Sequence, residues 1–151
     1  MNWWNIGYIA GVIGAGMLIP VQTGFNTQLG RALNGPLYST AMVFIAGLMT
    51  TLAFALISRA PFPSWSEAAR APAFSWFAGG GLGALYIVTL TMLAPRLGAA
   101  PTVAFVVVGQ MVCSALIDHF GLLGFATHEV SALRILGLAL MVVGVALVRL
   151  F

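Results

Sequence analysis

Four polar side chains recur along residues 101–118 at spacings that fit one face of a helix. They are Thr102, Gln110, Ser114 and Asp118, and residues four apart on a helix are surface neighbours. If the surroundings are lipid, this face must turn inward, because an unsatisfied polar group there costs several kcal/mol. Such a face lines a solute pathway or bonds helices together. The spacing leaves both roles open for Gln110 and Ser114.

Asp118 and His119 are adjacent ionisable residues at the end of that segment. An ionisable group within a membrane is by default a functional candidate. At a helix end, however, a carboxylate also meets water or loop backbone. We therefore expect structural roles for Asp118 and His119, with proton coupling as the alternative.

Residues 6–29 carry a second set of polar side chains, which follows Pro20. Gln22 and Asn26 are four residues apart and share a helix face. A proline inside a span removes a backbone hydrogen bond and can kink the helix, and discontinuous helices line transporter cavities. We expect Gln22 and Asn26 to line a cavity; the alternative is that the helix leaves the bilayer here. Tyr86, in a later apolar segment, needs a partner for its hydroxyl, so it closes the cavity or bonds a neighbouring helix.

Sequence motifs typical of enzymes are either absent or lack the structural context that they require. Residues 79–84 fit the glycine pattern of a dinucleotide-binding turn, but no strand precedes them. The chain has no lysine, which a P-loop requires, and His119 and His128 lack the spacing of zinc ligands. Cys113 is the single cysteine, so no intrachain disulfide or cysteine-rich zinc site can form. The sequence predicts no enzyme, no metal and no cofactor.

The elements that position these residues follow from composition. Of 151 residues, 61% are hydrophobic and 6% are charged, against roughly 25% charged in soluble domains. A bilayer is crossed by about 20 mostly apolar residues, and five stretches approach this: 6–29, 37–58, 73–94, 101–118 and 131–150. We predict an all-α integral membrane protein with one five-helix transmembrane domain over residues 1–151. No basic residue precedes the first stretch, so we expect a retained helix and not a cleaved signal peptide.

Short connections join these stretches. The segment from Ser64 to Glu67 resembles a capping box that opens a short interfacial helix, and Ser131 is placed to cap the last helix. Short links make helices that are neighbours in the sequence pack antiparallel.

The six arginines divide evenly between the two membrane faces that five spans imply. One face, that of the N-terminus, carries Arg59, Arg70 and Arg134, and the other carries Arg31, Arg96 and Arg149. A bias in basic residues normally sets orientation, so an even split predicts insertion both ways unless other signals orient the chain. Two opposite copies would pair as an antiparallel dimer. Scattered arginines do not form the basic stripe that nucleic acid requires, so no nucleic-acid partner is expected.

Three segments together resemble a known family. They are Gln22-Thr-Gly-Phe-Asn26-Thr-Gln-Leu-Gly30, Gly109-Gln110 and Ile117-Asp-His-Phe-Gly121, and they resemble the short YdcZ-type family of the drug/metabolite transporter superfamily. The resemblance implies a five-helix half of a ten-helix inverted-repeat transporter, which would be completed by an antiparallel copy or by a paralogous five-helix chain. Small multidrug exporters of that superfamily use a glutamate in their first helix, and residues 6–29 contain no acid.

These observations together predict a multi-pass protein of the bacterial inner membrane. As an antiparallel homodimer in the lipid bilayer, it would move a small neutral, amphipathic or anionic solute. The predicted substrate pathway consists of Gln22, Asn26, Tyr86, Gln110 and Ser114. The alternative is a non-transporting membrane subunit that stabilises or partners another membrane protein.

Overall fold

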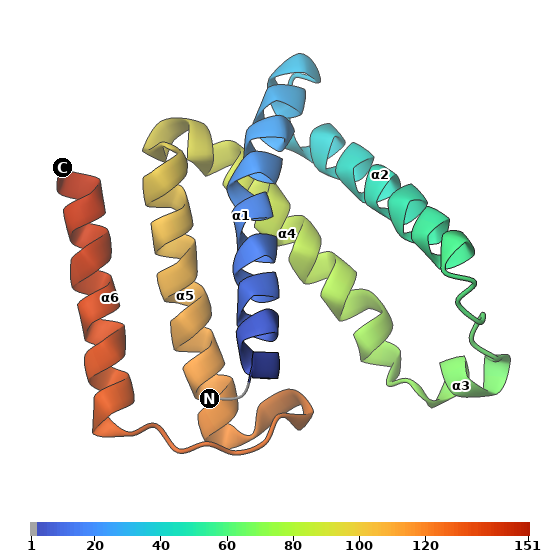
Figure 1. The fold of residues 1–151 in the computed structure, drawn as a ribbon. Coiled ribbons are helices and arrows are strands. Elements are labelled where there is room, and N and C mark those ends of the chain that lie inside the picture. Colours follow the sequence, from blue (N-terminus) through green and yellow to red (C-terminus); the bar gives the residue numbers. More distant parts are fainter. Residues whose placement is uncertain (1–2) are drawn as a thin grey trace. The chain divides into compact units, whose positions relative to one another are not determined.

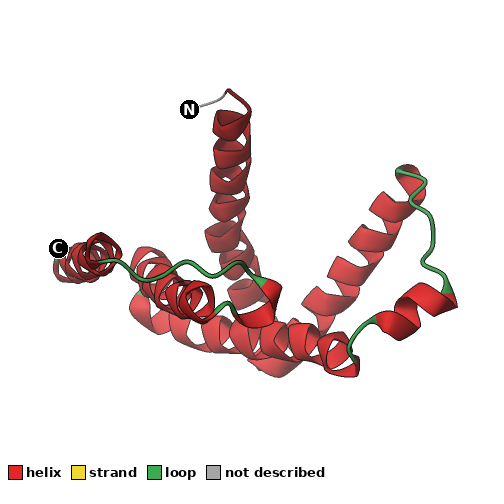
Figure 2. Cartoon of the chain, turned by 90° about the horizontal axis from the view of Figure 1, so that it is seen from below, coloured by secondary structure: helices red, strands yellow, loops and turns green. Residues whose placement is uncertain are grey.

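The computed structural model describes the backbone of residues 3–151 and the side chains of residues 6–151, and these residues form helices and their connections (Figures 1 and 2). In chain order the elements are α1 (Trp3–Ala32), α2 (Pro36–Ile57), α3 (Trp65–Arg70), α4 (Ala73–Leu97), α5 (Ala99–Phe120), η1 (Leu122–Gly124) and α6 (Ala132–Leu150). All of them except α3 and η1 are long and apolar enough to cross a membrane. The all-helical, five-span expectation is confirmed.

Three helices are longer than the sequence predicted. The stretch expected at 6–29 runs from Trp3 to Ala32. The stretch expected at 73–94 continues through Pro95 to Leu97, and the one expected at 101–118 runs from Ala99 to Phe120. The break between them is a single residue, Gly98, with φ +91°, a backbone conformation that L side chains rarely adopt. Pro95 lies close enough to the helix end that its missing N–H interrupts only the last turn.

The chain divides into two compact units, Met1–Arg96 and Leu97–Phe151. The expectation of one five-helix domain stays a prediction. In the first unit, α1 and α2 meet at the turn that joins them and diverge toward their other ends (Figure 1). The amide of Gly35 donates to the carbonyl of Gly30 at 2.9 Å and closes this turn.

Gly30 marks the point where α1, α2 and α4 converge. A Cβ atom at this position would lie 2.9 Å from Cγ2 of Thr91 on α4 and 3.4 Å from Oγ of Ser39 on α2. A second contact joins α2 and α4, since a Cβ on Gly83 would lie 3.3 Å from the ring of Phe44. At both contacts, therefore, the absence of a side chain on glycine leaves room for the neighbouring helix.

The short helix α3 begins with the capping box that the sequence predicted. The hydroxyl oxygen of Ser64 accepts from the Glu67 amide at 3.3 Å, and the Glu67 carboxylate accepts from the Ser64 amide at 2.8 Å. Hydrogen bonds from the backbone and hydroxyl of Ser64 lower the pKa of Glu67 below its ordinary value, because they favour the charged carboxylate.

The long helices keep most of their large apolar side chains exposed. The buried positions are occupied by small or polar residues: Asn26, Gly30, Ser39, Thr40, Thr91, Ala94 and Thr102. Several glycines have open space around them, among them Gly7, Gly11 and Gly14 on α1. Apolar exposure of this kind is what helices in lipid present, and close helix contacts in lipid rely on small residues.

Candidate functional site

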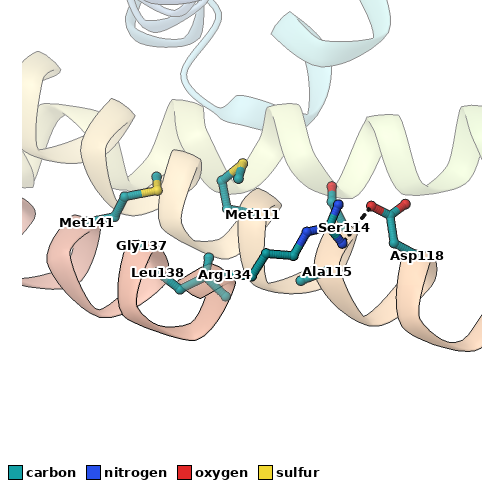
Figure 3. Close-up of a pocket in the computed structure, with 8 residues that line it drawn as sticks. All are labelled: Met111, Ser114, Ala115, Asp118, Arg134, Gly137, Leu138 and Met141. Atoms are coloured by element: carbon teal, nitrogen blue, oxygen red, sulfur yellow. Dashed lines mark ion pairs between the residues drawn. The ribbon is translucent and has the colours of Figure 1, made fainter. Parts of the chain in front are cut away.

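A groove lies between α5 and α6 in the second unit (Figure 3). Its volume is about 300 Å³. Met111 and Met141 line it with apolar surface, and at the other end the Arg134 side chain reaches from α6 toward Asp118 on α5. Ser114 also lines this groove. The groove is therefore apolar along its length and charged at one end.

The antiparallel packing of α5 and α6 brings Asp118 and Arg134 together. The hydroxyl of Ser131 accepts from the Arg134 amide at 3.3 Å and caps α6, as the sequence predicted. From this first turn, the Arg134 guanidinium lies 3.6 Å from the Asp118 carboxylate and donates to the His128 carbonyl at 3.4 Å. Because both charged side chains are about 40% exposed (44% and 34%), this pair stabilises the fold only modestly.

The connection after α5 is held by the two residues that the sequence singled out at its end. The Val130 amide donates to Nδ1 of His119 at 3.2 Å, so this nitrogen carries no proton. The His128 amide donates to the backbone carbonyl of Asp118 at 2.8 Å. Each residue therefore orders the loop that leads into α6.

Gly121 ends α5 in the left-handed conformation, with φ +61° and ψ +34°. A Cβ here would lie 2.6 Å from Oγ1 of Thr127, which folds back across the helix end. Glycine is needed for two separate reasons, the backbone conformation and the close approach of Thr127.

A second groove lies within the first unit, between α1, α2 and α4. Its volume is about 410 Å³, and Gln22 from α1 lines it together with Gly47 and Thr51 from α2 and Ile87 from α4. Gln22 is exposed and makes no hydrogen bond with the described residues. Gln22 therefore lines a groove within the first unit, and its role in a solute cavity stays a prediction.

Asn26 lies one turn beyond Gln22 on α1 and is 7% exposed. The helix is continuous through Pro20 and reaches Ala32, so Asn26 is part of the helix body. One further turn leads to Gly30, where Thr91 and Ser39 approach. The inward face of α1 thus runs from the groove into a buried polar region.

Thr91 is an unusual member of this region. Five other helical threonines donate their hydroxyl to the carbonyl four residues earlier: Thr23, Thr40, Thr50, Thr51 and Thr102. The buried hydroxyl of Thr91 has no partner among the described residues. Its carbonyl also lacks the usual helical donor, because the residue four positions on is Pro95. Unpartnered buried polar groups are rare and costly.

The remaining predicted pathway residues lie outside both grooves. Tyr86 on α4 is 37% exposed, and Gln110 on α5 is exposed. Gln22 and Asn26 belong to the first unit, whereas Ser114 and Asp118 belong to the second. A cavity shared by all these residues stays a prediction. Within the described chain, no group of three His, Cys, Asp or Glu residues could hold a metal ion.

The comparison with protein families decides the class of protein. The family model described as "Putative inner membrane exporter, YdcZ" matches residues 7–147. The chain belongs to the YdcZ family. It is a multi-pass protein of the inner membrane, and the resemblance drawn from its sequence is confirmed. Searches of the curated proteins and of the solved structures returned no match.

The geometry explains the segment from Ile117 to Gly121, by which the sequence resembled the YdcZ family. Asp118, His119 and Gly121 all order the loop between α5 and α6. Sequence reasoning missed Arg134 as the partner of Asp118, although its charge and its place just after the loop were the available signal. It also missed Thr91, since an unpaired hydroxyl depends on where α4 meets α1.

Proposed function

We propose that this YdcZ-family chain is a transporter that works as an antiparallel homodimer and moves a small neutral, amphipathic or anionic solute across the inner membrane. Its family is described as one of exporters. The observation that carries the proposal is the exposure of amide side chains on membrane-length helices, at Gln22 on α1 and Gln110 on α5. Facing lipid, such amides would lack partners, at a cost of several kcal/mol each.

The depth of these side chains supports a pathway. The apolar part of α1 covers 27 residues, or about 40 Å of helix, against a hydrocarbon thickness of about 30 Å. With Ile19 at the bilayer midplane, Gln22 and Asn26 would lie about 4.5 Å and 10 Å from it. Gln110 is at the middle of α5. All three amides would lie within the hydrocarbon layer, where only protein or trapped water can satisfy them.

The antiparallel arrangement is supported by the charges at the helix ends. The last turns of α1, α4 and α6 carry Arg31, Arg96 and Arg149, respectively. There the positive charge of each arginine interacts favourably with the negative end of the helix dipole. Arg59, Arg70 and Arg134 would lie on the opposite face, so neither face has the excess that sets orientation.

Reporter fusions at the C-terminus test this arrangement. Unmodified protein should show the reporter on both sides of the membrane, and two lysines added beside Arg149 should hold that end in the cytoplasm. A single orientation in the unmodified protein would refute the antiparallel homodimer. A paralogous five-helix partner would then have to supply the second half.

Transport itself is tested by flux in liposomes. Solutes that raise the unfolding temperature of the purified protein are the candidates to assay, and Gln22→Leu and Gln110→Leu should each reduce their flux. A protein that binds no solute, and whose loss lowers the amount of another membrane protein, would instead be a stabilising subunit. No catalytic step is proposed.

A further inference from the structure

We propose that the groove between α1, α2 and α4 binds the uncharged polar end of a small amphipathic solute through Gln22, with the apolar tail against α2 and α4. The inference rests on the proposed transport function for its biological role. It narrows the solute from neutral, amphipathic or anionic to uncharged and amphipathic.

The groove walls suit an alkyl chain. Val43, Phe44 and Leu48 from α2 face Ile87 from α4 across a volume of about 410 Å³. A Cβ placed on Gly47, which also lines the groove, would have no atom within 4 Å apart from its chain neighbours and its own helix backbone. The space beside this glycine is therefore open, and a volume of this size is typical of small-molecule sites.

Two polar side chains line the groove, and both are uncharged. The hydroxyl of Thr51 donates to the Gly47 carbonyl at 2.9 Å, which leaves its oxygen free to accept. Gln22 makes no hydrogen bond with the described residues, so its amide can both donate and accept. A hydroxyl or amide group on the solute would match this pair.

A charged solute group would find no counter-charge in this groove. None of its described lining residues is ionisable. The polar region beyond it, at Asn26 and Thr91, is uncharged as well. An ion moved here would lose hydration without an opposite charge to compensate. The α5–α6 groove does contain charged side chains, Asp118 and Arg134, but these two form an ion pair with each other.

Thiol labelling in a Cys113→Ala background tests the inference. Thr51→Cys introduces a thiol inside the groove, and Thr50→Cys introduces one beside it on the same helix. Thr50 is the matched control, since its hydroxyl also donates to the carbonyl four residues earlier, at 2.8 Å, yet it does not line the groove. The probes are 1-hexanol, hexanoate and hexylammonium at pH 7, which share one alkyl chain. The measurement is the rate of reaction with N-ethylmaleimide in liposomes.

We expect 1-hexanol to slow labelling of Thr51→Cys at least fivefold and to leave Thr50→Cys unchanged. Hexanoate and hexylammonium should need concentrations at least tenfold higher for the same protection. Adding Gly47→Leu should abolish protection, because the leucine fills the groove. Gly80→Leu, at another glycine with open space in a membrane-length helix, should not.

Equal protection by the three probes, stronger protection by a charged one, or equal effects on both cysteine variants would overturn the inference. Persistence of protection in the Gly47→Leu variant would do the same. Protection by 1-hexanol without any flux in liposomes would leave the binding site intact and refute transport. Flux in liposomes without protection by 1-hexanol would refute the binding site and leave the transport function intact.

Discussion

Replacing Gly121 by alanine should destabilise the α5–α6 hairpin through two separable terms. An L residue in the left-handed conformation costs roughly 1–2 kcal/mol, and Gly121 has φ +61°. The new Cβ would also lie 2.6 Å from Oγ1 of Thr127, far inside ordinary contact, and overpacking of this kind costs about 1–3 kcal/mol. We expect Gly121→Ala to lower the free energy of unfolding by about 2–5 kcal/mol.

A double-mutant cycle with Thr127→Ala separates the two terms. Thr127 is exposed, so Thr127→Ala alone should change stability by less than about 0.5 kcal/mol. In the Gly121→Ala background it removes Oγ1 and leaves Cβ of residue 127 at 3.7 Å, an ordinary contact. The double variant should therefore recover the overpacking term of about 1–3 kcal/mol and retain only the backbone strain.

Reversible unfolding by SDS in mixed micelles measures all four proteins of the cycle. The recovery should show as a coupling energy well above experimental error. If the two substitutions were additive, the close approach of Thr127 to the helix end would not exist in solution. If Gly121→Ala cost nothing, the left-handed cap itself would be wrong.

Three further predictions concern other contacts. Gly30→Ala should cost about 1–3 kcal/mol, because its Cβ would lie 2.9 Å from Cγ2 of Thr91; Thr91→Ser should restore most of this in the same unfolding assay, and no rescue would contradict the contact. Asp118→Asn should lower folded yield and reduce the free energy of unfolding by about 0.5–1 kcal/mol. Arg134→Gln should cost at least as much, because it also removes the hydrogen bond to the His128 carbonyl. A normally folded Asp118→Asn protein that lacks only pH-dependent transport would instead make the carboxylate a coupling group. The pKa of Glu67 is lowered, so the stabilisation of α3 by its carboxylate is fully present above the unfolded pKa of 4.5 and is lost as the pH falls through the folded pKa. Amide exchange in α3, corrected for intrinsic rates, should therefore accelerate as the pH falls through that range. In Glu67→Gln the corrected exchange rate should not change with pH.

The five spans were predictable because length and hydropathy alone decide whether a helix can cross a bilayer. The caps at Ser64 and Ser131 were predictable for a similar reason, since each depends on residues three positions apart. The helix predicted at residues 73–94 was ended just before Pro95, whereas α4 continues to Leu97. A proline near a helix end removes one hydrogen bond without stopping the helix.

The site was less accessible to sequence reasoning. The pair of Asp118 and Arg134 depends on the path of the connection from residue 121 to 131, and no local spacing rule predicts that path. The groove at Gln22 needs Gly47 and Ile87 from two other helices, and the unpaired hydroxyl of Thr91 appears only once α4 meets α1. Of the polar residues that the sequence predicted to share one face of α5, only Ser114 and Asp118 line the α5–α6 groove.

The glycines of the long helices offer a way to find surfaces that a single chain leaves open. Gly30 and Gly121 are tightly enclosed within the chain, whereas Gly7, Gly11 and Gly137 have open space around them. A glycine in open space should accept alanine in a monomer, and even gain helix stability. In a saturation mutagenesis experiment, any such glycine that does not tolerate alanine must therefore contact another molecule or the other unit of the chain. The tolerance map of these positions would trace the surfaces on which each unit is packed, without a structure of the assembly.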